Sequence, residues 1–209
     1  MRRRLAPLLG HDGAVELLDR SLAYTRVALA AVTDDRLGAR TPCEGWDLAR
    51  LLAHMEDSLD AFGEGATGRV RLTTTTPADV RVRTLQQKAC ALLGAWSLEV
   101  PASVTVGGRA LDTSVLALAA ALEITVHGWD VAWAVGLDHP VPDALALQLE
   151  PVAQTLVTLA DRGTRFAVAV PVDGRSGASA LLLGHLGRRM TGPPGQENAK
   201  PDAGPQIAS

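Results

Sequence analysis

Apolar residues recur every three or four positions along most of this chain, and short polar or glycine- and proline-rich stretches separate the runs. That spacing places the apolar side chains on one face of an α-helix. Five segments show it, over about residues 15–32, 48–62, 82–96, 113–135 and 145–163. The fourth is apolar nearly all round, which is typical of the most buried helix of a bundle. The pattern therefore predicts four or five packed helices.

The segments between the predicted helices also contain residues that predict a helix cap, a loop and a short strand. Asp47 can cap the second helix, and residues 63–76 predict a loop that Pro77 ends at the start of the third helix. Residues 103–106 alternate in polarity before two glycines, which indicates a short strand that enters a tight turn. We therefore expect a small hairpin or an extended crossing between the third and fourth helices.

The C-terminal part is less regular. Residues 166–172 predict an extended segment and residues 178–186 a short helix, whereas residues 191–209 are rich in glycine, proline and polar residues and predict a disordered tail. The whole pattern favours an all-α fold, an up-down four-helix bundle with an extra helix and a short extended C-terminal segment. The bundle would occupy residues 1–190.

Composition narrows the class of protein. The 209 residues, 47% of them hydrophobic, suit one globular domain, and a net charge of −3 with mixed signs argues against nucleic acid or an anionic membrane as a partner. The apolar stretch after Arg4 is too short for a secretory signal, and residues 115–126 are shorter than the ~20 that a membrane span needs. Two cysteines, Cys43 and Cys90, cannot form a disulfide framework. We expect a cytoplasmic monomer or homodimer.

Three side chains suggest a metal site. Glu123 and His127 lie four residues apart in the fourth helix, so they share one face and can reach the same ion. His54 borders the apolar stripe of the second helix and can join them from there. Two imidazoles and one carboxylate leave a divalent ion with positive charge and open coordination positions, as in catalytic sites. Zinc is the first choice, and iron(II) or nickel also suits this set.

A metal is not required to account for Glu123 and His127 in an apolar helix. An ion pair between the two, an arginine such as Arg83, or a more exposed helix face would also compensate their burial. Arg81 and Arg83 are candidates to hold a substrate carboxylate, or else are solvated surface residues. Asp57, one turn from His54, is a candidate to orient that imidazole, with an exposed salt bridge as the alternative.

The segments Thr41-Pro-Cys-Glu-Gly-Trp-Asp-Leu-Ala-Arg-Leu-Leu-Ala-His54 and Glu123-Ile-Thr-Val-His127-Gly-Trp-Asp-Val-Ala-Trp-Ala resemble the metal-binding domain of the mycothiol-dependent maleylpyruvate isomerase family, in the DinB-like superfamily. The resemblance spans about residues 10–190 and implies a four-helix bundle that binds a divalent metal, usually zinc, through His54, Glu123 and His127. The isomerase itself has a further C-terminal domain, which this sequence lacks, so maleylpyruvate isomerisation is not expected.

The resemblance implies an enzyme that binds a low-molecular-weight thiol, mycothiol or a similar one, on its metal. The thiolate would add to a small electrophile, giving S-transfer, or add and leave again, giving isomerisation of a conjugated double bond. Two alternatives stay open. A metal-bound water would make the protein a thiol-independent hydrolase or lyase, and a bundle without turnover would bind a metal or small molecule only.

Overall fold

The computed structural model describes residues 10–67, 76–98, 100–106, 109–163, 165–173 and 176–190. The predicted disordered tail, residues 191–209, and residues 68–75 of the predicted loop lie outside the described residues.

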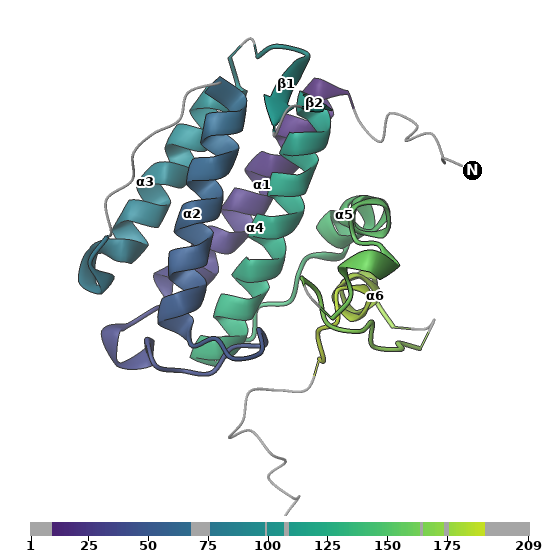
Figure 1. The fold of residues 1–209 in the computed structure, drawn as a ribbon. Coiled ribbons are helices and arrows are strands. Elements are labelled where there is room, and N and C mark those ends of the chain that lie inside the picture. The colour runs from purple at the N-terminus through teal and green to yellow at the C-terminus, as the bar shows by residue number, and fades with distance from the viewer. Residues whose placement is uncertain are drawn as a thin grey trace, which may run out of the picture.

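Four long helices form a bundle, as predicted: α1 (His11–Ala30), α2 (Leu48–Thr67), α3 (Ala78–Trp96) and α4 (Thr113–Val135). Around the bundle, α4 packs between α1 and α2, and α3 packs against α2 on the far side from α4 (Figure 1). Leucines, alanines and other apolar residues of all four helices fill the interior. The all-α bundle is therefore confirmed.

The helices do not simply alternate in direction. Arg81 contacts the start of α2, at the carbonyl of Ala49, and Lys88 contacts Asp60 further along both helices, so α2 and α3 run parallel. The stretch of ten residues between Thr67 and Ala78 permits this arrangement. Fully extended, it spans at most about 35 Å, which exceeds the ~30 Å length of a 20-residue helix. Helices α1 and α4 also run in the same direction, since both begin at the end of the bundle beside β2 (Figure 1). The simple alternation of an up-down order is therefore corrected to two parallel pairs, α1 with α4 and α2 with α3.

Close packing of α1 on α4 depends on two small residues. The hydroxyl of Thr25, the polar position on the apolar stripe of α1, donates a hydrogen bond of 2.8 Å to the carbonyl oxygen of Ile124. A Cβ atom on Gly128 would lie only 3.1 Å from the Cα atom of Thr25. Gly128 therefore lets the two backbones approach next to His127.

Two predicted helix ends are wrong. The second helix continues to Thr67 instead of stopping before Gly63, because Gly65 leaves room for the side chain of Leu116 where α2 packs on α4. The fifth helix, α5 (Asp143–Leu156), stops before the predicted end. Leu159, which fits the helical spacing, is 91% exposed and lies in a 3-10 turn, η2 (Leu159–Asp161).

The shorter elements agree more closely with the prediction. Strands β1 (Ser103–Val106) and β2 (Arg109–Asp112) pair antiparallel as the expected hairpin. The Asp47 side chain accepts a hydrogen bond from the backbone N–H of Arg50, which caps the start of α2. A further 3-10 turn, η1 (Asp34–Arg36), lies between α1 and α2.

The C-terminal elements lie beside the bundle. Helix α6 (Ala178–His185) packs on α5, and α5 contacts α1 and α4 (Figure 1). Residues 166–172, the predicted extended segment, form no helix or named strand, and the backbone N–H of Val170 donates to the carbonyl of Gly184. Among the described residues, α4 alone is long and apolar enough to cross a membrane, but 78% of its most apolar stretch is buried inside the protein. Burial of this kind is typical of a core helix.

Candidate functional site

Helices α2 and α4 bring the three candidate ligands together. His54 Nε2 lies 2.7 Å from Glu123 Oε1, and His127 Nε2 lies 3.2 Å from the same oxygen. The two imidazole rings meet edge to face, with centroids 5.0 Å apart. One donor atom from each residue lies within 4.8 Å of the others, which is close enough for a shared ion. The helical spacing thus places Glu123 and His127 on the face that meets His54.

Asp130 holds the other side of the His127 ring. Its Oδ2 atom lies 2.9 Å from His127 Nδ1, and the aspartate is completely buried. A carboxylate in this position favours the tautomer with hydrogen on Nδ1, which leaves the Nε2 lone pair directed at Glu123. Metal-binding histidines are commonly oriented in this way. The sequence-based prediction did not include this role, although the spacing of three residues places Asp130 on the same helix face as His127.

Arg188, which follows α6, reaches back to this aspartate. Its Nη2 atom lies 2.8 Å from Asp130 Oδ2 and 3.6 Å from Cys43 Sγ. The Cys43 thiol in turn lies 3.4 Å from Asp130 Oδ2 and 4.0 Å from His127 Nδ1. Cys43, His127 and Asp130 could also converge on a cation, but Arg188 already neutralises Asp130. We therefore assign the candidate metal site to the His54 group.

The charges around His127 favour a cation between the two carboxylates. Burial alone would raise the pKa of Glu123, but the charge of His127 and hydrogen bonds from both histidines hold it well below its usual value. Burial would likewise raise the pKa of Asp130, and Arg188 with His127 lowers it to about 2. Burial would lower the pKa of His127, yet Glu123 and Asp130 raise it. Both carboxylates are thus ionised, and either a proton or a metal ion can supply the positive charge.

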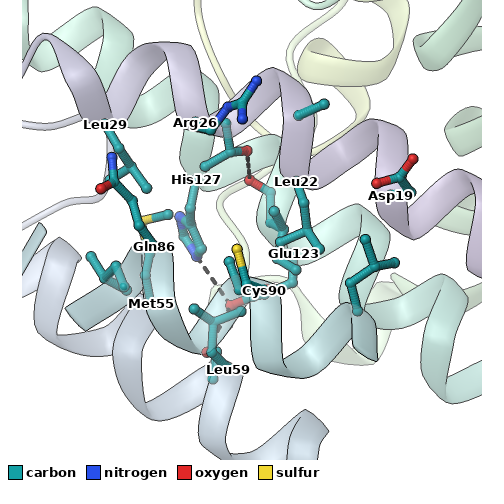
Figure 2. A pocket seen from close by; sticks show the side chains of 17 residues that line it. Asp19, Leu22, Arg26, Leu29, Met55, Leu59, Gln86, Cys90, Glu123 and His127 are labelled. Atoms are coloured by element: carbon teal, nitrogen blue, oxygen red, sulfur yellow. Dashed lines mark hydrogen bonds and ion pairs between the residues drawn. The ribbon is translucent and has the colours of Figure 1, made fainter. Parts of the chain in front are cut away.

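A cavity of about 290 Å³ reaches this site from between α1 and α3. Figure 2 shows Glu123 and His127 on its wall, with the ion pair between them drawn as a dashed line. Most of the remaining lining is apolar: Leu22, Ala23, Leu29, Met55, Leu59, Leu85, Ala89, Leu93 and Ile124. His54 is not part of the lining. Glu123 and His127 therefore line the cavity, whereas His54 contacts Trp46 outside that lining.

The two arginines suggested for substrate binding lie elsewhere. The guanidinium of Arg81 lies 3.4 Å from Glu56 and also donates to the backbone carbonyl of Ala49, which ties α3 to α2. Arg83 is exposed on α3, and neither arginine lines the cavity, whereas Arg26 of α1 does. Asp57, suggested to orient His54, is exposed. The structure thus brings together the three candidate metal ligands and leaves these other residues outside the cavity.

Comparisons with known proteins agree on one family. The family model described as the mycothiol maleylpyruvate isomerase N-terminal domain matches residues 18–132 of this chain. This match contains His54, Glu123, His127 and Asp130 but ends before Arg188.

Similarity over most of the chain is found with uncharacterized proteins from two strains of Mycobacterium tuberculosis. Each is 26% identical over 197 residues, which cover 88% of this chain and 98% of the relative.

Two solved structures share the fold. One is the mycothiol-dependent maleylpyruvate isomerase, with a TM-score of 0.52 and 17% identity over 69% of this chain and 70% of that one. The other is a histidine-to-alanine mutant of the same isomerase, with a TM-score of 0.54 and 16% identity over 69% of this chain and 68% of that one. Because the family model covers more than half of the chain, the protein belongs to the family of the mycothiol maleylpyruvate isomerase N-terminal domain.

Proposed function

We propose that this protein is an enzyme that uses a divalent metal ion and a low-molecular-weight thiol, mycothiol or one like it, to modify a small electrophile. The reaction is S-transfer to the electrophile or isomerisation of its double bond. The observation that carries the proposal is the convergence of His54, Glu123 and His127, of which Glu123 and His127 also line an apolar cavity. The family and the solved isomerase, whose names include mycothiol, support the choice of thiol.

The donor set fits a divalent ion. Two imidazole nitrogens and a carboxylate oxygen are ligands that zinc accepts, and Asp130 orients one imidazole through its other nitrogen. Iron(II) and nickel suit the same set, so zinc is the first choice and not the only one. When bound, the ion supplies the positive charge that lowers the pKa of a coordinated thiol toward neutral pH.

The side chains of the protein orient the metal ligands and exclude water from the site. Asp130 retains the proton on His127 Nδ1 and so keeps Nε2 free to bind. The Ser58 hydroxyl, 3.5 Å from Glu123 Oε1, can donate to that carboxylate and limit its rotation. The apolar lining excludes water, which protects a thiolate from competing protonation and strengthens electrostatic interactions.

The expected partner is a small-molecule substrate, and neither nucleic acid nor a membrane, because the charged residues of both signs are mixed along the chain. A cytoplasmic location follows from the use of a cellular thiol. A monomer or homodimer suits a site that one chain completes from its own helices.

Metal analysis and a thiol-dependent assay test the proposal. The purified protein should contain about one divalent ion per chain, and mycothiol should form a conjugate or isomerised product with an electrophile. His54→Ala and His127→Ala should each lose most of the metal and at least 100-fold in rate, whereas His11→Ala, a histidine at the start of α1, should lose neither. Wild-type rates in metal-free variants would defeat the proposal.

The two alternative functions give different outcomes. Turnover that needs the metal but no thiol would identify a hydrolase or lyase. Tight binding of a metal or small molecule without turnover would identify a binding protein.

A further inference from the structure

The cavity opens where α1 and α3 separate. Asp19 and Arg26 of α1 and Cys90 of α3 are exposed at its rim, and Figure 2 shows these side chains around the labelled Glu123 and His127. A molecule that enters between the two helices would therefore reach the candidate metal ligands directly.

The charges along this path are nearly balanced. Apart from the candidate metal ligand His127, Arg26 is the only cation among the described lining residues, and Asp19, two turns before it on α1, is an exposed anion. A dicarboxylate is best held by paired, often bidentate, contacts to cations, and burying an unpaired carboxylate is costly. Arg81 and Arg83, which could have supplied a second positive charge, lie outside the lining. With Glu123 and a bound thiolate as ligands, the proposed divalent ion would carry no net charge. Arg26 alone would then have to compensate a dianion such as a dicarboxylic acid, so the cavity is poorly suited to one.

The size and polarity of the cavity indicate which ligands fit it. A volume of about 290 Å³ is near the lower limit for small-molecule sites. It corresponds to roughly ten water-sized groups, since one water occupies ~30 Å³ in the liquid. The side chains of Leu22, Leu59, Leu85 and Leu93 would pack against apolar atoms of the ligand, and Gln86 is a neutral hydrogen-bonding group among them.

From this geometry we propose that the cavity binds a neutral, mainly apolar electrophile, an α,β-unsaturated ketone or aldehyde of about ten non-hydrogen atoms. The inference rests on the proposed function and names its substrate class. In the reaction, the thiol sulfur forms a bond to the β-carbon, the carbon–carbon π bond breaks, and the thiol hydrogen ends on the α-carbon as a proton. No oxidant and no leaving group are needed. Reversal after rotation about the former double bond would give isomerisation.

A binding measurement without thiol tests the cavity independently of turnover. In calorimetry, benzylideneacetone, a neutral aryl enone, should bind both the zinc-loaded and the metal-free protein. Maleate should bind the metal-free protein at least tenfold more weakly than the enone does. Ala89→Phe and Ala23→Phe, which fill the cavity from α3 and α1, should each weaken enone binding at least tenfold and leave zinc content unchanged. Ala91→Phe, an exposed position on α3 outside the lining, is the matched control and should bind the enone normally. Thermal melting shows whether each variant is folded.

The possible results separate this inference from the proposed function. Equal enone binding by folded wild type, Ala89→Phe and Ala23→Phe would overturn the inference even if thiol conjugation occurs. Tighter binding of maleate than of the enone, lost in Arg26→Gln, would also overturn it and point to an anionic substrate. Enone binding that the two variants abolish, without any conjugation by mycothiol, would support the cavity assignment and contradict the proposed function.

Discussion

At the scale of single residues, His127 is held from both sides. Glu123 faces its Nε2 atom, and Asp130, paired with Arg188, faces its Nδ1 atom. The ring therefore has one orientation before any ion binds, which reduces the entropy lost on binding. Arg188 contributes from a distant part of the chain because it keeps Asp130 ionised.

Replacement of this aspartate should weaken metal binding. In Asp130→Asn, the amide can donate to Nδ1 as well as accept from it, so the tautomer is no longer fixed, and zinc affinity should fall about 10- to 100-fold. Competition with a chromophoric chelator measures the affinity. Asp57→Asn, an exposed carboxylate on α2, is the control and should bind zinc normally. Equal affinities for wild type and Asp130→Asn would contradict the orienting role.

Glu56 is a second buried carboxylate, with a structural role. Its side chain is 7% exposed and lies 3.0 Å from Lys88 and 3.4 Å from Arg81, so it joins α2 to α3. Burial alone would raise the pKa of Glu56, but hydrogen bonds from Thr76 and Lys88 and the charges of Lys88 and Arg81 lower it overall. The ionised form is therefore the one that stabilises the fold.

The contribution of Glu56 should depend on pH. Glu56→Gln should lower the free energy of unfolding by about 2 to 3 kcal/mol at pH 7, since bonds to charged groups are lost. The pKa of Glu56 is lower in the folded than in the unfolded chain, so its carboxylate stabilises the fold fully above pH 4.5, the ordinary pKa of a glutamate. This stabilisation is lost as the pH falls through the pKa of the folded protein. Urea denaturation of both proteins at pH 7 and pH 3 should show the difference shrinking. A constant difference would contradict the role of the charge.

Sequence spacing predicts some site residues and not others. Glu123 and His127 are four apart on one helix, and His54 borders an apolar stripe, so their meeting can be anticipated from helix geometry. The ion pair between Arg188 and Asp130 joins residues 58 positions apart, from segments with no shared period. No local pattern shows such a contact, because it depends on how α6 packs on the rest of the protein.

At the scale of elements, the approach of α1 to α4 positions His127. Gly128 lies against Thr25, where no Cβ atom fits without a shift of the α1 backbone. Gly128→Ala should therefore destabilise the protein by about 1 to 3 kcal/mol, as overpacked cores do, and weaken zinc binding through the displaced neighbour. Gly94→Ala on α3, where a Cβ would have nothing within 4 Å, should instead stabilise by up to about 1 kcal/mol. Urea melts and a zinc titration of both variants test this, and an unchanged Gly128→Ala protein would contradict it.

The helices themselves follow from the periodicity, but their ends and directions do not. Leu159 continues the apolar stripe of α5, yet the helix stops at Leu156 and leaves Leu159 exposed. The spacing predicts an apolar helix face but does not show whether another element packs against it. Likewise, the parallel pair of α2 and α3 depends on the reach of residues 68–77, which periodicity cannot reveal. Tertiary packing decides both.

At the scale of the whole molecule, the candidate site joins the two halves of the bundle. His54 lies on α2, which pairs with α3, whereas Glu123 and His127 lie on α4, which pairs with α1. Through Asp130 and Arg188, the same site also connects to the C-terminal segment after α6. An ion held there would therefore bridge elements that separate on unfolding, and its binding free energy would add to the stability of the fold.

Metal removal should consequently lower the melting temperature of the whole protein. At a free zinc concentration 100 times the dissociation constant, binding stabilises the native state by about 2.7 kcal/mol, which for a chain of this size raises the melting temperature by roughly 5 to 10 °C. Calorimetry with zinc and with a chelator should show this difference for wild type and for His11→Ala, and almost none for His54→Ala or His127→Ala. A zinc-induced rise in melting temperature that persists in His54→Ala and His127→Ala would show that the ion binds elsewhere and does not bridge α2 and α4.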